Sequence, residues 1–351
     1  MNSKAIFHPS VEGAQHGAKS LEEFVIFAKQ SGAKGAQPSN FMLQNKDGSL
    51  KTAKEIGDIF KKHGIFLDGI SAHCPFWVHT TAWTGSPTIR PFIPADVAKK
   101  PVAEIEQWAE DYIFRLLDLC AELGIKIVPM FWGVAFGWEV ATGYPWGFWA
   151  SGKKGDEGSY DLIAEGEARF FQKTIKIRNH ANELGICLAH EIHPGTAAAC
   201  AEDFDKLIEI CDLDMCLVVN ADPSHCWENE HWEDRLLKTA DRVYACHVKN
   251  HVVRPGMPLR TMEPDWQKRP MQFTDLASGD INLRRYAEVL KEIGYPQRYC
   301  KVMGTATAPL IVEAESAHAD LDHTSAAGIQ YVRENLCFPV ASGSFEDGMG
   351  A

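Results

Sequence analysis

Amphipathic stretches alternate with short apolar runs along most of the chain. Five of the amphipathic stretches end at a glycine that precedes an apolar run, and these residues are Gly32, Gly64, Gly124, Gly185 and Gly294. A glycine just past a helix adopts the left-handed conformation that satisfies the last carbonyl groups. In the segment 280–294, apolar residues recur at helical spacing after Asp280, a candidate N-cap. The pattern therefore predicts repeated helix–strand units.

The apolar runs predict eight strands, at residues 5–7, 35–37, 67–71, 126–129, 187–189, 216–219, 243–246 and 310–314. Their apolar residues are mostly consecutive, which is typical of parallel strands that helices cover on both faces. Eight such units favour an α/β fold of the (β/α)₈ TIM barrel type over an open doubly wound sheet. The chain lacks a Gly-x-Gly-x-x-Gly segment after the first strand and a Gly-Lys-Ser/Thr loop, so dinucleotide-binding and P-loop folds have no support.

Two long segments interrupt the repeat, after the fourth and seventh predicted strands. We expect one domain over residues 1–351, with insertions at 131–160 and 248–279 and a tail at 337–351. Loops after barrel strands form the active-site face. The first insertion is rich in tryptophan and glycine, so we expect Trp132 and Trp138 to contact a flat, partly apolar substrate such as a sugar face. The alternative is that these rings only pack the insertion onto the barrel.

Charge and cysteine usage limit the possible partners. The net charge is −12, from 35 Lys and Arg against 47 Asp and Glu, which argues against nucleic acid and anionic membranes as partners. No charge-free segment is long enough to span a bilayer, and the N-terminus does not resemble a signal peptide. Ten cysteines without a Cys-x-x-Cys pair argue against disulfides and thiolate zinc sites. We expect a cytoplasmic homo-oligomer that binds a small carbohydrate.

Ionisable residues follow the last four predicted strands. Glu191, Asp222 and His247 occur at intervals close to one βα unit, roughly 30 residues, and Glu313 follows the second insertion. One such carboxylate is best explained as a helix cap or an ion pair. Four groups that converge at one mouth of a barrel indicate a divalent-metal site instead. Its oxygen-rich donors favour Mn²⁺, Co²⁺ or Mg²⁺ over a structural Zn²⁺.

Several histidines lie near these positions. His193 comes two residues after Glu191, so both side chains share one side of a strand and His193 is a candidate for substrate binding. His190 is expected to pack outward. His73, at the end of the third strand, is a second candidate for the pocket, although a structural role fits it equally well. The same two readings stay open for other histidines, namely His8 and His79.

The strand ends resemble the sugar phosphate isomerase/epimerase family of the xylose isomerase-like TIM barrel superfamily, which includes ketose 3-epimerases and inosose dehydratase-like enzymes. The resemblance extends from about residue 35 to about residue 335. Asp222-x-x-His225 is similar to the family's metal-binding aspartate followed by a substrate-contacting histidine. His247-Val-Lys-Asn is similar to its His-x-Lys-Asp segment.

Strands five and eight extend the resemblance and also show departures. Glu313 matches the metal-binding glutamate of the family's Ile-Glu-x-Glu strand, and Glu315 is the competing ligand there. The further glutamate that ketose 3-epimerases carry after the strand-five ligand is Ala197 in this chain. Asn250 replaces the family's aspartate, and Arg254 only roughly matches its substrate-binding arginine.

The resemblance implies an isomerase or epimerase that abstracts a proton beside a metal-bound sugar carbonyl and forms an enediolate. It implies Mn²⁺ as the metal, with Co²⁺, Mg²⁺ or Zn²⁺ as other choices. Glu191 and Glu313 are then the two bases, and His225 holds a substrate hydroxyl. The alternative is a lyase or dehydratase that eliminates a group from a keto-sugar or 3-keto-glycoside. The charge argues against endonuclease IV-like DNA repair, and the intact ligand set against a sugar-binding protein without catalysis.

Overall fold

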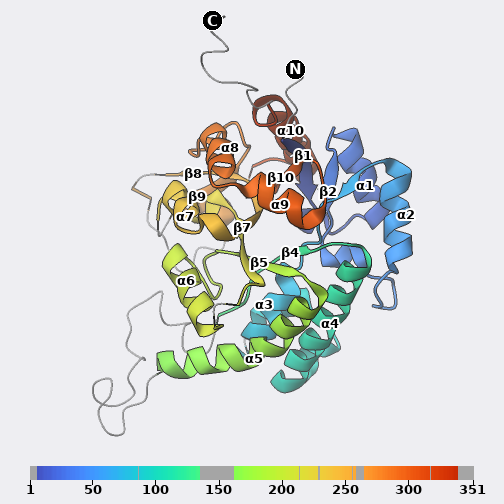
Figure 1. Ribbon diagram of the computed structural model, residues 1–351, viewed down its shortest axis with the longest axis vertical. Helices are drawn as coiled ribbons and strands as arrows, with labels where there is room; N and C mark the ends of the chain where they lie inside the picture. Colours follow the sequence, from blue (N-terminus) through green and yellow to red (C-terminus); the bar gives the residue numbers. More distant parts are fainter. Residues whose placement is uncertain are drawn as a thin grey trace, which may run out of the picture.

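The computed structural model describes residues 6–85, 87–134, 162–212, 214–227, 230–254, 256–257, 265–316 and 318–338. Eight parallel strands form a curled sheet in the middle of the described chain, with helices around it (Figure 1). The strands are β1 (Phe7–Glu12), β2 (Gly35–Gln37), β3 (Phe66–Leu67), β4 (Ile127–Met130), β5 (Cys187–Glu191), β6 (Leu217–Ala221), β7 (Val243–Val248) and β10 (Ala308–Val312).

The strand order is that of a TIM barrel opened between its third and fourth strands. The sheet runs β3-β2-β1-β10-β7-β6-β5-β4, so β1 pairs with both β2 and β10. Among the described residues, β3 and β4 share no ladder. The two edges meet just beyond β3, where the Ala72 N–H donates to the Pro129 carbonyl over 2.9 Å. The predicted (β/α)₈ fold is confirmed.

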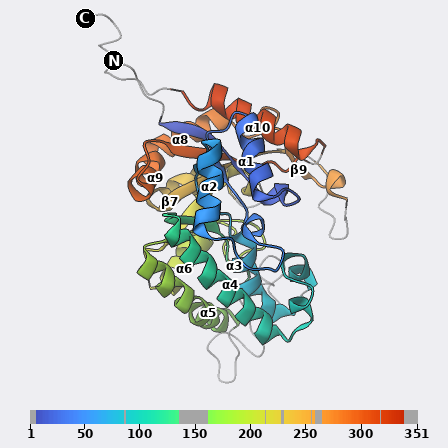
Figure 2. The same ribbon diagram turned by 90° about the vertical axis from the view of Figure 1, so that its right-hand side faces the viewer.

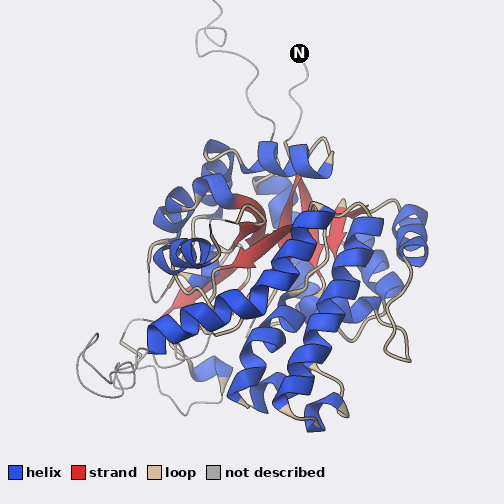
Figure 3. Cartoon of the chain, turned by 60° about the horizontal axis from the view of Figure 1, so that its bottom comes forward, coloured by secondary structure: helices blue, strands red, loops and turns tan. Residues whose placement is uncertain are grey.

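Helices cover the outside of the sheet, as Figures 2 and 3 show. They are α1 (Leu21–Gln30), α2 (Ala53–His63), α3 (His73–Thr81), α4 (Val102–Glu122), α5 (Leu162–Leu184), α6 (Ala201–Ile210), α7 (Trp232–Lys238), α8 (Leu283–Glu292), α9 (Tyr295–Met303) and α10 (Leu321–Asn335). Capping boxes at Ser20 and Thr52 start α1 and α2, because each side chain accepts from the backbone three residues on. No described helix is long and apolar enough to cross a membrane.

The five glycines that were expected to end helices all have positive φ angles. Gly64 is typical: it adopts the left-handed conformation after α2, and its N–H donates to the Phe60 carbonyl. Two local predictions need correction. Asn282, not Asp280, caps α8, because its side chain accepts from the Arg285 N–H. Gly294 leads into α9 and not directly into a strand.

Strand boundaries differ from the prediction where polar side chains are buried. The first strand is Phe7–Glu12 and not 5–7, because His8, Ser10 and Glu12 interrupt its apolar pattern although all three are buried. His8 consequently lies inside β1, where its ring contacts Asp68 and Thr307, and not after the strand. Of the predicted strand 67–71, only Leu67 belongs to β3.

The predicted insertion after β7 contains a two-stranded hairpin. Strands β8 (Asn250–Val253) and β9 (Met271–Thr274) pair antiparallel, and Asn250 fixes their base by donating to the Leu276 and Ile281 carbonyls. Most of the other insertion, residues 135–160, lies outside the described residues, as does the tail from 339. All ten cysteines are free, in agreement with the expected absence of disulfides.

Candidate active site

Four strands bring four potential metal ligands to one end of the sheet. Glu191 ends β5, His247 lies in β7, and Asp222 and Glu313 directly follow β6 and β10. One ligand atom from each residue lies within 4.8 Å of the others, and all four residues are buried. The structure therefore brings together the four residues that the sequence indicated as candidate metal ligands.

The four side chains form a tight polar cluster. His247 Nδ1 lies 3.0 Å from Glu191 Oε2 and 3.1 Å from Glu313 Oε2. Asp222 Oδ1 accepts from the Ser224 N–H, whereas Asp222 Oδ2 is buried and accepts no hydrogen bond. His225 Nε2 lies 3.5 Å from this oxygen, and a buried carboxylate oxygen that accepts no hydrogen bond is costly. Three carboxylates and one imidazole therefore fit a divalent cation, which this oxygen atom in particular would help to bind.

The charges of the cluster influence one another strongly. Burial alone would raise the pKa of Glu191, but His247, together with the contacts of His225 and His73, outweighs it and holds that pKa well below its usual range. Burial would lower the pKa of His247, yet Glu191 and Glu313 hold it well above its usual range. Asp222 behaves differently, since burial raises its pKa to about 7. Burial thus sets Asp222 apart from Glu191, whose pKa the surrounding histidines lower.

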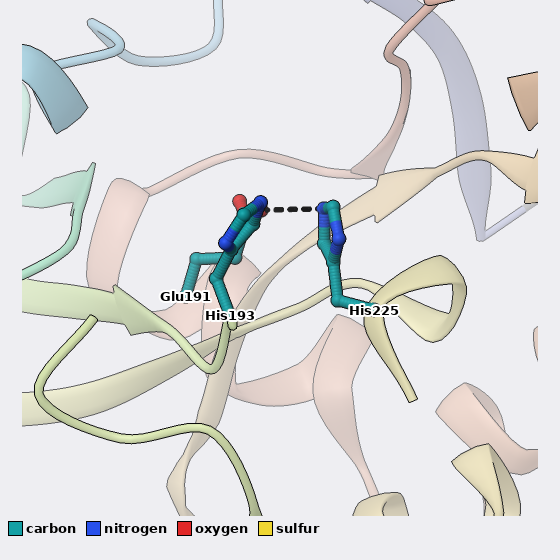
Figure 4. Close-up of side chains that lie close together, drawn as sticks. All are labelled: Glu191, His193 and His225. Carbon is teal, nitrogen blue, oxygen red and sulfur yellow. Dashed lines mark ion pairs between the residues drawn. The ribbon is translucent and has the colours of Figure 1, made fainter. Parts of the chain in front are cut away.

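Glu191 is also surrounded by two further histidines. His73 Nε2 lies 3.2 Å from Oε2 of Glu191, and His225 Nε2 lies 3.3 Å from its Oε1. Figure 4 shows Glu191, His193 and His225 pointing toward one another, with the ion pair of Glu191 and His225 marked. These three residues are a second group with metal-ligand spacing. Burial, followed by the nearby His193, holds the pKa of His225 well below its usual range.

Three residues that the sequence did not single out adjoin the cluster. Lys249 is buried with its Nζ 3.3 Å from Glu313 Oε2, and it also pairs with Glu315. Gln15 Nε2 donates to both glutamates over 3.0 Å. Glu12 ends β1, and its buried carboxylate oxygens have no hydrogen-bond partner. The position of Lys249 inside the His-x-Lys-Asn segment could have indicated that residue. Glu12 was missed because the predicted first strand ended at residue 7, whereas β1 ends at Glu12.

A cleft of about 640 Å³ opens beside the cluster. Loops after several strands and the β9 strand line it, with the residues Gln15, His193, Pro194, His225, Trp227, Arg269, Pro270, Met271, Phe273, Glu315, Ser316 and Leu321. His225 and Gln15 connect the cleft to the cluster, because they contact Glu191 and Glu313 respectively. A molecule in this cleft would therefore lie next to the candidate metal ligands.

The structure places only some of the predicted substrate contacts at the cleft or the cluster. His193 and His225 line the cleft, and His73 reaches Glu191. Trp132 is a correction: it is fully buried between Phe76 and Phe170 in the core, so no substrate can touch it.

Arg254, exposed on the hairpin, donates to Gln272 and does not line the cleft. His190 packs against Phe204 away from the cleft, as expected. Trp138 lies outside the described residues.

The fold and the cluster together define an α/β barrel with a candidate metal centre at the carboxyl ends of its strands. The family described as "Xylose isomerase-like TIM barrel" matches residues 25–334, so the chain belongs to this family. No curated protein matches the chain.

Several solved structures share the fold at low sequence identity. A xylose isomerase-like TIM barrel protein from Mycobacterium smegmatis, in complex with magnesium, has a TM-score of 0.59 at 15% identity, covering 96% of this chain and 99% of its own. For a D-allulose 3-epimerase from Methylomonas sp. the TM-score is 0.55, with 11% identity and coverage of 96% and 100%. For AsbF, a probable 3-DHS dehydratase from Bacillus anthracis, the TM-score is 0.57 at 13% identity, covering 93% of this chain and 99% of its own. These similarities show the shared fold.

Proposed function

We propose that the protein is a divalent-metal-dependent isomerase or epimerase of keto-sugars. The observation that carries the proposal is the buried group of Glu191, Asp222, His247 and Glu313 beside an open cleft. Family membership and the fold shared with a ketose epimerase support an enzyme that acts on sugars. Mn²⁺ is the expected metal, and the magnesium complex of one similar protein supports a divalent cation.

The residues divide the proposed work between them. When bound, the metal would polarise the sugar carbonyl and acidify the neighbouring C–H group. Glu191 and Glu313 approach His247 from β5 and from the end of β10, so they are the candidates for removing that proton and for returning one from the opposite side. Proton removal leaves an enediolate, and its reprotonation on the other side inverts the carbon.

The cleft residues would orient the substrate. His225 and His193 face the cleft with their ring centroids 3.9 Å apart, and His225 also contacts Glu191. We assign to them the holding of sugar hydroxyl groups next to the base. Gln15 reaches Glu313 and lines the cleft at the same time, so it would orient the second carboxylate.

A second candidate is a lyase that eliminates water or a larger group from a keto-sugar. The cleft volume favours it, because about 640 Å³ lies in the roughly 300–1,000 Å³ range of sites that enclose drug-sized ligands. The dehydratase with the same fold adds support. The two reactions begin with the same proton removal and differ in whether a leaving group lies next to the resulting anion.

Proton exchange in deuterated water distinguishes these candidates. The Mn²⁺-loaded protein is incubated with a panel of ketoses and 3-keto-glycosides, and products are followed by NMR. Deuterium incorporation without loss of a group is the expected result. Release of water or of an aglycone would replace the isomerase by the lyase, and a complete lack of exchange would refute both. Asp222→Asn serves as the inactive comparison, and exposed Asp58→Asn as the matched control.

A further inference from the structure

The cleft beside the candidate metal ligands has two chemically different parts. Its polar residues are Gln15, His193, His225, Arg269, Glu315 and Ser316, of which His225 and Gln15 contact the cluster. Its apolar part consists of the residues Pro194, Trp227, Pro270, Met271, Phe273 and Leu321. The C–H face of one small sugar ring could cover only a fraction of these six apolar side chains.

Phe273 on β9 lies at the boundary between the two parts. Its ring packs edge-on against His225 at 5.6 Å, and the Lys249 ammonium lies 4.0 Å from its centroid. Phe273 is 6% exposed and Met271 is 7% exposed, so both side chains are packed into the protein. The apolar part is therefore a built surface directly next to the polar one.

Trp227 and Leu321 complete the apolar part from two other elements. Trp227 follows β6 and Leu321 begins α10, and both are only half-buried, which leaves surface for a ligand. Half-buried aromatic and aliphatic side chains that face one cavity are typical of sites for flat apolar groups. The described residues supply this wall without the insertion 131–160.

We infer that the substrate is a keto-sugar that carries an apolar ring, with the sugar next to the metal ligands and the ring against Trp227, Met271 and Leu321. The inference rests on the proposed function for the placement of the sugar. The ring contributes binding by burying apolar surface and by packing on Trp227. Trp227 is thus a specificity-determining residue of this site.

Binding calorimetry with matched ligands tests the inference. The Mn²⁺-loaded protein is titrated with phenyl 3-keto-β-glucoside and with methyl 3-keto-β-glucoside, which differ only in the group that would occupy the apolar part. We expect the phenyl compound to bind about tenfold more tightly, a modest gain for one buried and stacked ring. Equal affinities, or no binding of either compound, would overturn the inference.

Variants of Trp227 test whether this residue causes the preference for the phenyl compound. Trp227→Ala should reduce the phenyl preference to about twofold or less, while Trp227→Phe should keep most of it because a ring remains. The control is Val253→Ala on β8, a half-exposed residue that does not line the cleft and should keep the full preference. An unchanged preference in a folded Trp227→Ala protein would contradict the assignment.

This binding readout separates the inference from the proposed function. Phenyl-selective binding without any proton exchange would support the apolar part and refute the isomerase. Exchange on simple ketoses without phenyl selectivity would leave the isomerase standing and overturn the inference.

Discussion

Glu191 is the residue on which the contacts of the candidate site converge. Its Oε2 accepts from Asn220 Nδ2 over 2.8 Å and lies near His73 and His247, whereas its Oε1 faces His225. Neighbours on several elements therefore fix the orientation of one carboxylate. A carboxylate held in this way suits a role as ligand or base, because its geometry does not have to be reorganised during the reaction.

Replacing either proposed base should stop turnover more than binding. Glu191→Gln and Glu313→Gln keep the size of the side chain but remove the proton acceptor, so kcat should fall by about 10²–10⁴-fold. Steady-state kinetics on the ketose found by proton exchange measures this, with Glu209→Gln, an exposed residue of α6, as control. Near-normal kcat in both variants would eliminate the two-base assignment.

Trp132 offers a test of its revised placement in the core. Truncation to Ala removes a fully buried indole between Phe76 and Phe170, so the free energy of unfolding should fall by about 3–5 kcal/mol. Urea unfolding gives this value. An unchanged unfolding free energy combined with a raised KM would restore the substrate contact that the sequence predicted.

At the scale of elements, one buried ion pair ties α5 to the start of β6. Arg178 Nη1 lies 2.8 Å from Asp214 Oδ2, and Asp214 Oδ1 accepts from Asn182 and from the Cys216 N–H. The Arg178 side chain is 2% exposed, so it depends on this partner. The pair helps to position β6, from which Asp222 follows.

Asp214→Ala should therefore lower the free energy of unfolding by about 3 kcal/mol at neutral pH, because it leaves a buried guanidinium unpaired. Burial would raise the pKa of Asp214, but the hydrogen bonds from Cys216 and Asn182 outweigh it and lower that pKa. A carboxyl with a lowered pKa stabilises the fold above its unfolded pKa, about 4, and loses this effect as the pH falls through its folded value.

Denaturant unfolding at several pH values measures how the stabilisation by Asp214 changes with pH. The difference between wild type and Asp214→Ala should shrink below about pH 4, where Asp214 of the unfolded chain takes up a proton, and be lost as the pH falls through the lowered pKa of the folded protein. A difference that is constant with pH would contradict the ion-pair explanation. The exposed pair of Lys54 and Asp58 is the control, since Asp58→Ala should change little at any pH.

The ends of helices and strands could be predicted where the residues at that position determine the backbone conformation. A left-handed glycine needs only its own conformational freedom, so the helix ends at Gly64 and Gly124 followed from sequence. The bounds of β1 and the β8–β9 hairpin could not be predicted in this way. Their burial or pairing depends on distant neighbours: Ser10, for instance, is buried although its residue type is usually exposed. The contacts that bury such residues leave no local pattern.

At the scale of the whole molecule, the order of the units predicted the barrel and the meeting of four strand ends. Parallel strands place their carboxyl ends at one mouth, so Glu191, Asp222, His247 and Glu313 come together whatever the loops do. The cleft was not predictable in the same way. Gln15, Trp227 and Leu321 reach it from separate loops and helix ends, and their paths depend on packing across the molecule.

The proposed function requires the four strand-end residues to bind one divalent metal. Calorimetric titration of the metal-free protein with Mn²⁺ tests it most directly, alongside Asp222→Asn and the exposed control Asp58→Asn. We expect one tight site per chain in the wild type and the control. In Asp222→Asn, Mn²⁺ binding should be weaker by at least about 10–100-fold, the loss already caused by changing a residue that only hydrogen-bonds to a metal ligand. Equal affinity in all three proteins, or no binding to the wild type, would contradict it.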